Sequence, residues 1–244
     1  MCGRYTLTRH ENVAEDLEAA LEPAAASDAW WRPRWNIAPT QPAPVVIAAD
    51  GARTLALMRW GLVPHWAGRG ERRAPLMINA RRETLEDKAW LRDALAHRRC
   101  LVPTDGFFEW VRAAPGGPGK PPPPQPFYFH PPGARVCAFA GLWTRARDEQ
   151  GRELRSFTII TAPASALVQP IHDRMPAVLA PADYAAWLDP AVDVTAARAL
   201  LEPADDGWLR APVSTRVNKV DHDDAACVAP AAAPPPPAQG RLFD

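Results

Sequence analysis

The sequence predicts an α+β protein that folds as one domain and contains more strands than helices. The chain has 244 residues, of which 47% are hydrophobic, and ten tryptophans, so it can build a substantial core. Short runs rich in β-branched and aromatic residues outnumber the segments with helical spacing. The helical segments do not alternate regularly with these runs, which argues against a doubly wound parallel sheet.

Four helices are expected, at residues 11–21, at residues 85–98, and in shorter segments that follow Pro181 and Thr195. In the first, Val13, Leu17 and Leu21 recur at a spacing that places them on one helical face. Thr84 followed by Asp87 resembles a capping box ahead of the second helix. Pro181 suits the first position of a helix, where a missing N–H costs nothing.

Seven runs have the composition of strands: residues 45–48, 55–63, 100–110, 126–129, 136–144, 157–161 and 177–179. The proline-rich segment at 115–126 separates two of these runs, so we expect an exposed loop at the tip of a hairpin. Residues 229–244 are rich in Ala and Pro and cannot bury a core, which predicts a disordered tail. The folded domain is therefore expected to span residues 2–228.

Composition and charge exclude several classes of protein. The sequence has no run of about 18 apolar residues and no secretory signal, so we expect a cytoplasmic protein with no membrane span. The four cysteines are far apart and form no CxxC pair, which argues against a zinc site or a disulfide framework. We expect no metal, no cofactor and a monomeric state. The net charge of zero does not itself favour nucleic-acid binding, although basic residues are concentrated between residues 53 and 112.

Cys2 directly follows the initiator methionine. A small side chain at this position favours removal of Met1, which would leave an α-amine and a thiol on one residue. These groups ordinarily titrate near ~8 and ~8.5, so both are partly nucleophilic at neutral pH. A cysteine in second position is otherwise most often a small buried hydrophobe, so the remaining motifs must decide between the two interpretations.

Six segments place polar residues within apolar surroundings, where an unpaired polar group costs about 1–3 kcal/mol. They are CGRY at 2–5, WNIAPT at 35–40, RWGLVPHW at 59–66, INARRET at 78–84, DGFFEW at 105–110 and IHDRMP at 171–176. In this order they closely resemble the SRAP family, the SOS-response-associated peptidase fold whose members crosslink to abasic sites in single-stranded DNA. The resemblance runs from Cys2 to about Val220. It implies a single SRAP-type domain with antiparallel or mixed strands in a barrel-like core.

The resemblance also implies a reaction at Cys2 that the residues themselves permit. The α-amine attacks the aldehyde of a ring-opened abasic deoxyribose to give a Schiff base, and the thiol then closes a thiazolidine ring. The resulting crosslink would protect the lesion during the DNA damage response, with the protein at the nucleoid when it acts. The family name further implies a peptidase that removes residues ahead of Cys2.

Three more residues receive chemical roles from the same resemblance. His172 would shuttle protons during ring opening and imine formation. Glu109 would position or deprotonate the α-amine, and its apolar neighbours Phe108 and Trp110 should raise its pKa. Asn79 would hydrogen-bond the N-terminal residue or the sugar hydroxyl. The simpler interpretations are a structural histidine, a carboxylate on the polar face of a strand and an asparagine in a turn.

Six residues match family positions that contact DNA: Arg4, Arg81 and Arg174 at backbone phosphates, Trp66 beside the lesion, and Asn36 and Pro39 in the Asn-x-Ala-Pro turn. Phosphate contacts and base stacking carry little sequence information, so the preference for sequence should be low. For Trp66 the simpler interpretation is a core position.

Two other functions remain open from the residues. An N-terminal-nucleophile amidohydrolase also begins with Met-Cys-Gly, but it requires an oxyanion hole and a glutamine-binding set that the motifs do not supply. A noncovalent single-stranded DNA module would use the same Trp and Arg residues without a covalent step. A heat-stable adduct with an abasic oligonucleotide separates these functions. In the tail, Gln239–Phe243 (QGRLF) resembles the peptides by which bacterial replication proteins dock into the sliding clamp, which makes the clamp an expected partner.

Overall fold

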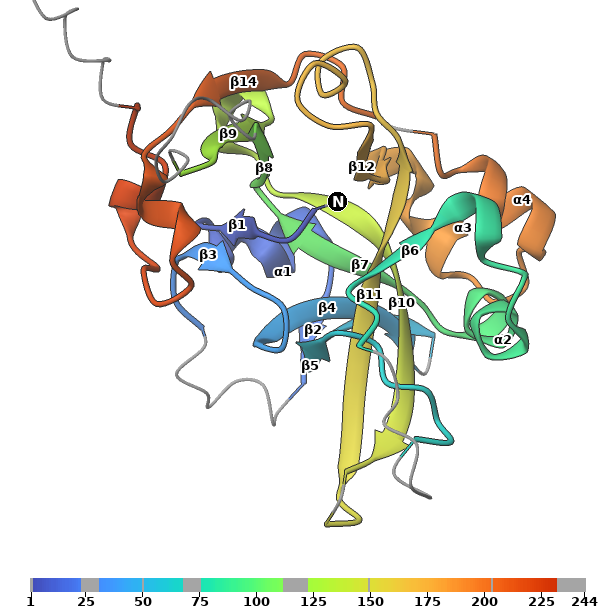
Figure 1. Ribbon diagram of the computed structural model, residues 1–244. Helices are drawn as coiled ribbons and strands as arrows, with labels where there is room; N and C mark the ends of the chain where they lie inside the picture. Colours follow the sequence, from blue (N-terminus) through green and yellow to red (C-terminus); the bar gives the residue numbers. More distant parts are fainter. Residues whose placement is uncertain are drawn as a thin grey trace, which may run out of the picture.

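The computed structural model describes residues 2–22, 31–49, 51–67, 76–111, 123–148, 150–202 and 204–231 (Figure 1). Met1, most of the proline-rich segment and the tail motif at 239–243 lie outside these residues. Within the described ranges, no helix is long and apolar enough to cross a membrane.

Five strands close into a barrel: β4 (Pro42–Ala49), β5 (Ala52–Trp60), β7 (Arg99–Thr104), β10 (Cys137–Arg147) and β11 (Glu153–Pro163). The order β11–β10–β7–β4–β5 is antiparallel throughout, and β5 pairs in parallel with β11 to complete the ring. Four short strands pair with its members: β2 (Ala20–Leu21), β6 (Asn79–Arg81), β12 (Arg174–Pro176) and β13 (Val178–Leu179). This architecture confirms the predicted mixed barrel.

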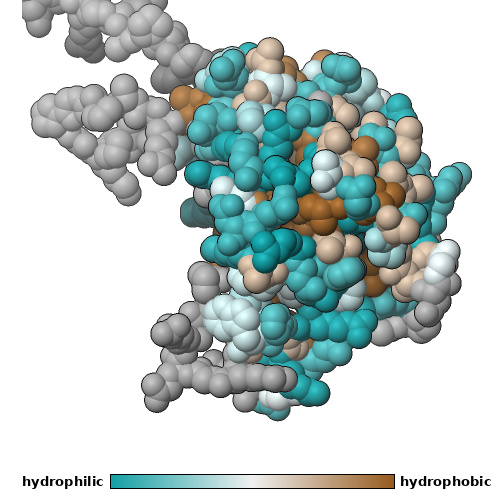
Figure 2. Space-filling view, turned by 90° about the vertical axis from the view of Figure 1, so that its right-hand side faces the viewer, coloured by the Kyte–Doolittle hydropathy of each residue, from teal (hydrophilic) through white to brown (hydrophobic). Residues whose placement is uncertain are grey.

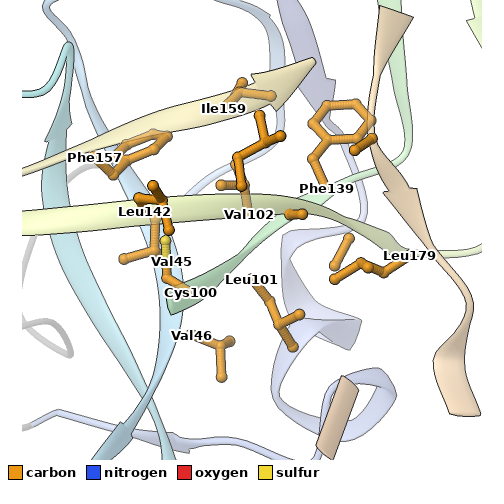
Figure 3. Packing of buried hydrophobic residues seen from close by; sticks show 14 of the residues in the cluster. Val45, Val46, Cys100, Leu101, Val102, Phe139, Leu142, Phe157, Ile159 and Leu179 are labelled. Atoms are coloured by element: carbon orange, nitrogen blue, oxygen red, sulfur yellow. The ribbon is translucent and has the colours of Figure 1, made fainter. Parts of the chain in front are cut away.

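Aliphatic and aromatic side chains from facing strands fill the core of the barrel (Figure 3). Val102, Phe139 and Phe157 are fully buried there. Gly141 allows the strands to approach, because a Cβ at this position would lie 2.8 Å from the sulfur of Cys100 and 2.9 Å from Val102. Close packing of this kind leaves no room for an added methyl group without rearrangement of neighbours.

A second sheet of five strands lies beside the barrel in the order β14–β9–β8–β1–β3. Its strands are β1 (Tyr5–Leu7), β3 (Arg34–Ile37), β8 (Gly106–Val111), β9 (Gln125–His130) and β14 (Leu209–Pro212). The run at 100–110, predicted as one strand, is therefore two strands in different sheets. The chain turns at Gly106, where a Cβ would lie 2.5 Å from the ring of Tyr128. β8 and β9 pair as a hairpin across the proline-rich segment.

Two helix predictions need correction. The segment at 11–21 holds only a 3₁₀ turn (His10–Asn12) and the four-residue α1 (Val13–Asp16), because Glu18 adopts a φ of +49° and β2 then pairs with β5. The second helix, α2 (Ala89–His97), begins later than predicted. Thr84 does not cap it and belongs to a separate 3₁₀ turn.

The two short helices lie close to their predicted positions. α3 (Tyr184–Leu188) follows a 3₁₀ turn that Pro181 opens, and α4 (Val194–Ala199) begins one residue before Thr195. Asp193 caps α4 by accepting a hydrogen bond from the amide of Ala196 at 3.0 Å. The face that carries β6 and the helices α2–α4 is mostly polar, with hydrophobic residues gathered near its middle (Figure 2).

The end of the described chain folds back over the second sheet. We call residues 213–231 the C-terminal strap. Its buried residues Val217 and Cys227 pack against Phe108 of β8 and form a second hydrophobic cluster. Asp223 ties the strap to β3 by accepting hydrogen bonds from the amides of Trp35 at 2.7 Å and Asn36 at 3.0 Å. The strap therefore forms one flank of the surface near β8.

Candidate active site

The N-terminal arm reaches the site along the β1–β8 ladder. Tyr5 pairs with Phe107, and the amide of Phe108 donates to the carbonyl of Arg4 at 3.1 Å. This antiparallel register continues toward Glu109 and brings the start of the chain beside it. Cys2 and Glu109, which are far apart in the sequence, thereby become neighbours.

Cys2 is fully buried, and its carbonyl accepts a hydrogen bond from Asn79 Nδ2 at 2.8 Å. The Asn79 contact matches one of its two predicted roles. Burial raises the pKa of the Cys2 thiol well above its usual range, and the negative charge of Glu109 raises it further. The expectation that the thiol is partly ionised at neutral pH is therefore wrong for this structure. The thiol is neutral.

Glu109 has the raised pKa that its neighbours predict. The side chain is only 3% exposed, and burial raises its pKa to about 7. A carboxylate with this pKa exchanges protons readily near neutral pH. The desolvation that keeps the Cys2 thiol neutral therefore also brings the pKa of Glu109 close to neutral pH.

His172 is held in one tautomer. Its Nδ1 accepts a hydrogen bond from the amide of Arg174 at 2.9 Å, so the neutral ring carries its proton on Nε2. Asp173 Oδ1 also lies 3.0 Å from Nδ1, but this carboxylate is largely exposed and an ion pair would require a proton on the nitrogen that already accepts. Burial lowers the pKa of His172 and favours the neutral ring.

Glu109 and His172 line one cleft of about 720 Å³, whereas the buried Cys2 and its partner Asn79 are not part of its wall. Among the described residues its wall is formed by Arg4, Glu109, Trp110, Pro124, Ile171, His172 and Asn218. The fold thus unites the N-terminal arm, β8, the segment before β12 and the C-terminal strap. Burial lowers the pKa of Arg4, whose guanidinium supplies positive charge to this wall.

Four wall residues were not predicted as site residues: Trp110, Pro124, Ile171 and Asn218. Trp110 Nε1 donates to Asn218 Oδ1 at 2.7 Å, and Asn218 Nδ2 donates to the carbonyl of Pro124 at 3.1 Å. These bonds lock the tryptophan ring in the wall. Trp110 lies within the DGFFEW motif and could have been chosen there, whereas no sequence signal distinguished Asn218.

The predicted phosphate ligands differ in their availability. Arg81 is exposed at the end of β6 and forms no ion pair within the described residues. Arg174 is 11% exposed in its side chain and forms a bidentate pair with Glu83 at 2.6 and 2.9 Å. The carbonyl of Thr161 accepts a further bond from Arg174 at 2.6 Å. A phosphate at Arg174 would therefore compete with Glu83.

The other predicted DNA contacts lie outside the cleft wall. Trp66 is 41% exposed on the segment after β5, which is unusual for a core tryptophan and consistent with stacking, and Pro39 is half-buried. Asn36 is fully buried, and its side-chain amide donates to the carbonyls of Val217, Lys219 and His222 at 3.2, 3.0 and 2.7 Å. This placement does not support a DNA contact. Asn36 anchors the C-terminal strap.

No group of three or more metal-ligating side chains occurs in the described part of the chain. The four cysteines are free thiols.

Comparison with known proteins identifies the family. The chain belongs to the SRAP family (SOS response associated peptidase), whose model matches residues 1–220. It is 34% identical over 221 residues to the abasic site processing protein YoqW of Bacillus subtilis, covering 89% of this chain and 94% of that protein. It is 33% identical over 270 residues to the abasic site processing protein HMCES of Gallus gallus, with coverage of 94% and 78%.

Solved structures share the fold. A protein from Bacteroides thetaiotaomicron superposes with a TM-score of 0.80 at 23% identity, covering 95% of this chain and all of that one. A phage-related protein from Bordetella bronchiseptica gives a TM-score of 0.65 at 32% identity, with coverage of 87% and 94%.

Glu109 is expected to make the protein less stable as the pH rises from 4.5 to about 7. Because its folded-state pKa is raised, its stabilising contribution is complete below the unfolded value of 4.5 and is lost as the pH passes about 7. That shift corresponds to about 3 kcal/mol. In urea unfolding, the free energy of unfolding of Glu109→Gln should equal that of wild type at low pH and exceed it above neutrality.

Glu83→Gln is the matched control, because the hydrogen bond from Arg174 lowers the pKa of Glu83. Its contribution has the opposite sign: it is present above the unfolded pKa and lost as the pH falls. If the free energies of unfolding of wild type and Glu109→Gln changed in parallel with pH, the raised pKa of Glu109 would be contradicted.

Proposed function

We propose that this protein forms a covalent thiazolidine crosslink between Cys2 and the ring-opened aldehyde of an abasic site in single-stranded DNA. The observation that carries the proposal is the contact set of Cys2, which Asn79 holds by its carbonyl beside the protonatable Glu109. The cleft next to them contains His172 and Arg4. The names of the relatives YoqW and HMCES as abasic site processing proteins support the same substrate.

The protonation states favour attack by the amine before the thiol. A neutral buried thiol is a poor nucleophile, whereas Glu109, with a pKa of about 7, can accept a proton from an ammonium that titrates near ~8. The amine nitrogen bonds to the aldehyde carbon, and the carbinolamine loses water to give the imine. Glu109, protonated by that transfer, gives its proton to the departing hydroxyl and takes one from the nitrogen, while His172 donates a hydrogen bond from Nε2 to the departing oxygen.

The thiol then completes the ring. Its sulfur bonds to the imine carbon while its proton passes to the imine nitrogen, so no other reactant is needed. Because both groups belong to Cys2, the step is intramolecular and gains several kcal/mol from proximity. In this assignment, burial of the thiol postpones its reaction until the imine has formed.

The two alternatives receive less support. An amidohydrolase would use the thiolate as nucleophile, and the raised pKa of the Cys2 thiol opposes its formation. A noncovalent binding module would have no use for the buried Glu109 or for the fixed tautomer of His172. Removal of residues ahead of Cys2 is retained as a second activity of the same site, since a free amine at Cys2 is a condition for the crosslink.

Mature wild-type protein is expected to give a heat-stable, denaturant-resistant adduct with a single-stranded oligonucleotide that contains one abasic site. Cys2→Ser should retain only a labile imine that borohydride can trap, because a hydroxyl closes the ring less favourably than a thiol. Intact-mass analysis checks both products. Stable adduct at wild-type level in Cys2→Ser would falsify the thiazolidine assignment.

Arg81→Ala is expected to weaken binding to single-stranded DNA and to lower the slope of log affinity against log salt concentration by about 0.7, the value of one phosphate contact. Arg81 suits this role because it is exposed and carries no ion pair within the described residues. Arg92→Ala removes another exposed arginine, on α2, and should leave the slope unchanged. Equal slopes for wild type and Arg81→Ala would remove the phosphate assignment.

We also propose that the tail docks into the replication sliding clamp through Gln239–Phe243. Two adjacent apolar residues, Leu242 and Phe243, can fill a hydrophobic pocket, and a proline-rich tether raises the local concentration of the domain near DNA. The isolated tail peptide is expected to bind the clamp with micromolar affinity by fluorescence anisotropy. Alanine at both apolar positions should abolish binding, and absence of binding by the native peptide at high clamp concentration would end the proposal.

A further inference from the structure

Asp105 anchors the N-terminal arm at the junction between the two sheets. It is 4% exposed and lies between β7 and β8. Its carboxylate accepts four hydrogen bonds: from Thr6 Oγ1 at 2.5 Å, from Thr8 N at 2.5 Å, from Thr8 Oγ1 at 2.7 Å and from Arg9 N at 3.0 Å. Bonds to an ionised acceptor are roughly twice as strong as neutral ones, so this set fixes the arm firmly.

Thr6 is held from several directions. Its carbonyl accepts from the amide of Asp105 at 3.1 Å and from Thr104 Oγ1 at 3.1 Å. Its hydroxyl also lies 2.8 Å from the hydroxyl of Tyr128, whose ring packs against Gly106. The backbone of Thr6 therefore cannot slide along β8 without breaking several buried bonds. We call Asp105 and its contacts to Thr6 and Thr8 the arm clamp.

The number of residues between the arm clamp and the chain start determines where the reactive amine lies. Thr6 pairs with Gly106 and Tyr5 with Phe107, and the carbonyl of Arg4 accepts from the amide of Phe108. Continued by the same register, Gly3 lies opposite Glu109 and Cys2 directly beyond it. A slip of one residue would move the amine by about 3.3 Å and turn its side chain to the opposite face of the sheet.

We propose that Asp105 is a positioning residue that sets the register of the arm and thereby places the amine of Cys2 against Glu109. This inference rests on the proposed chemistry at Cys2. Asp105 and its partners Thr6 and Thr8 do not line the cleft, so they act only through the position of the arm. The DGFFEW motif thus contains both the proton acceptor and, four residues earlier, the anchor that delivers the amine to it.

Three variants test the proposal. Asp105→Asn keeps the shape of the side chain, but it removes the charge and turns one of the two acceptor oxygens, which serve Thr6 on one side and Thr8 and Arg9 on the other, into a donor. Insertion of one glycine between Gly3 and Arg4 leaves the arm clamp intact and displaces Cys2 by one residue. Arg99→Gln is the matched control, because Arg99 is equally buried and donates four hydrogen bonds, to the carbonyls of Leu95 in α2, Trp187 in α3, and Asp189 and Val192 after α3, away from the cleft.

The first measurement separates positioning from stability. The crosslinking rate at saturating abasic DNA is expected to fall at least tenfold in Asp105→Asn and about a hundredfold in the insertion variant, as a displacement of a few ångströms predicts. The DNA concentration at half saturation should stay within twofold of wild type. Arg99→Gln should lose comparable thermal stability and keep the wild-type rate. A rate equal to wild type in Asp105→Asn or in the insertion variant would overturn the proposal.

A second measurement does not depend on DNA. Labelling of Cys2 by the small aldehyde glycolaldehyde, followed by intact mass, should show an inflection near pH 7 in wild type that Glu109→Gln removes. In Asp105→Asn and the insertion variant this inflection should be absent, and the pH dependence of labelling should resemble that of a free N-terminal cysteine. Retention of the inflection in both variants would overturn the positioning role. If wild type labels in this way but forms no adduct with abasic DNA, the proposed function fails and the positioning role stands.

Discussion

The arrangement of the site depends on the pairing of one strand, β11. Along its length it pairs in parallel with β5 and β6 and antiparallel with β10 and β12. The pairing with β5 closes the barrel, the pairing of Ile159 with Asn79 places the amide that holds Cys2, and the pairing of Pro163 with Arg174 places the segment that holds His172. Because one backbone ladder fixes these elements, their relative positions are as rigid as the barrel itself.

Desolvation is the second constraint, and it acts on two groups in different ways. The same burial keeps the Cys2 thiol protonated and brings the pKa of Glu109 to about 7. A buried carboxylate costs stability, yet a proton acceptor is useful only when its pKa lies near the working pH. Strongly shifted pKa values of this kind are common where titratable groups line a cleft.

Ion pairing adds a competition at the edge of the site. Glu83 presents two oxygens to the guanidinium of Arg174, much as a phosphate would. Arg81, two residues before Glu83 in the chain, forms no ion pair with a carboxylate within the described residues. An anion can therefore bind Arg81 once that side chain is desolvated. It can bind Arg174 only after the guanidinium has been released from the carboxylate of Glu83.

The sequence by itself determined the elements whose signal is local. β-branched and aromatic runs located the barrel strands, Cys2 and Glu109 stood out within short motifs, and the apolar neighbours of Glu109 correctly predicted its raised pKa. Tertiary structure decided the rest, because those outcomes depend on partners distant in the chain. Strand pairing shortened the helix at 11–21, and burial under the closed sheets made the thiol of Cys2 neutral. The side-chain amide of Asn36 donates hydrogen bonds to carbonyls of the C-terminal strap, some 180 residues away in the sequence. A sequence motif specifies which groups are present, whereas the hydrogen bonds and the dielectric around them exist only after the chain has folded.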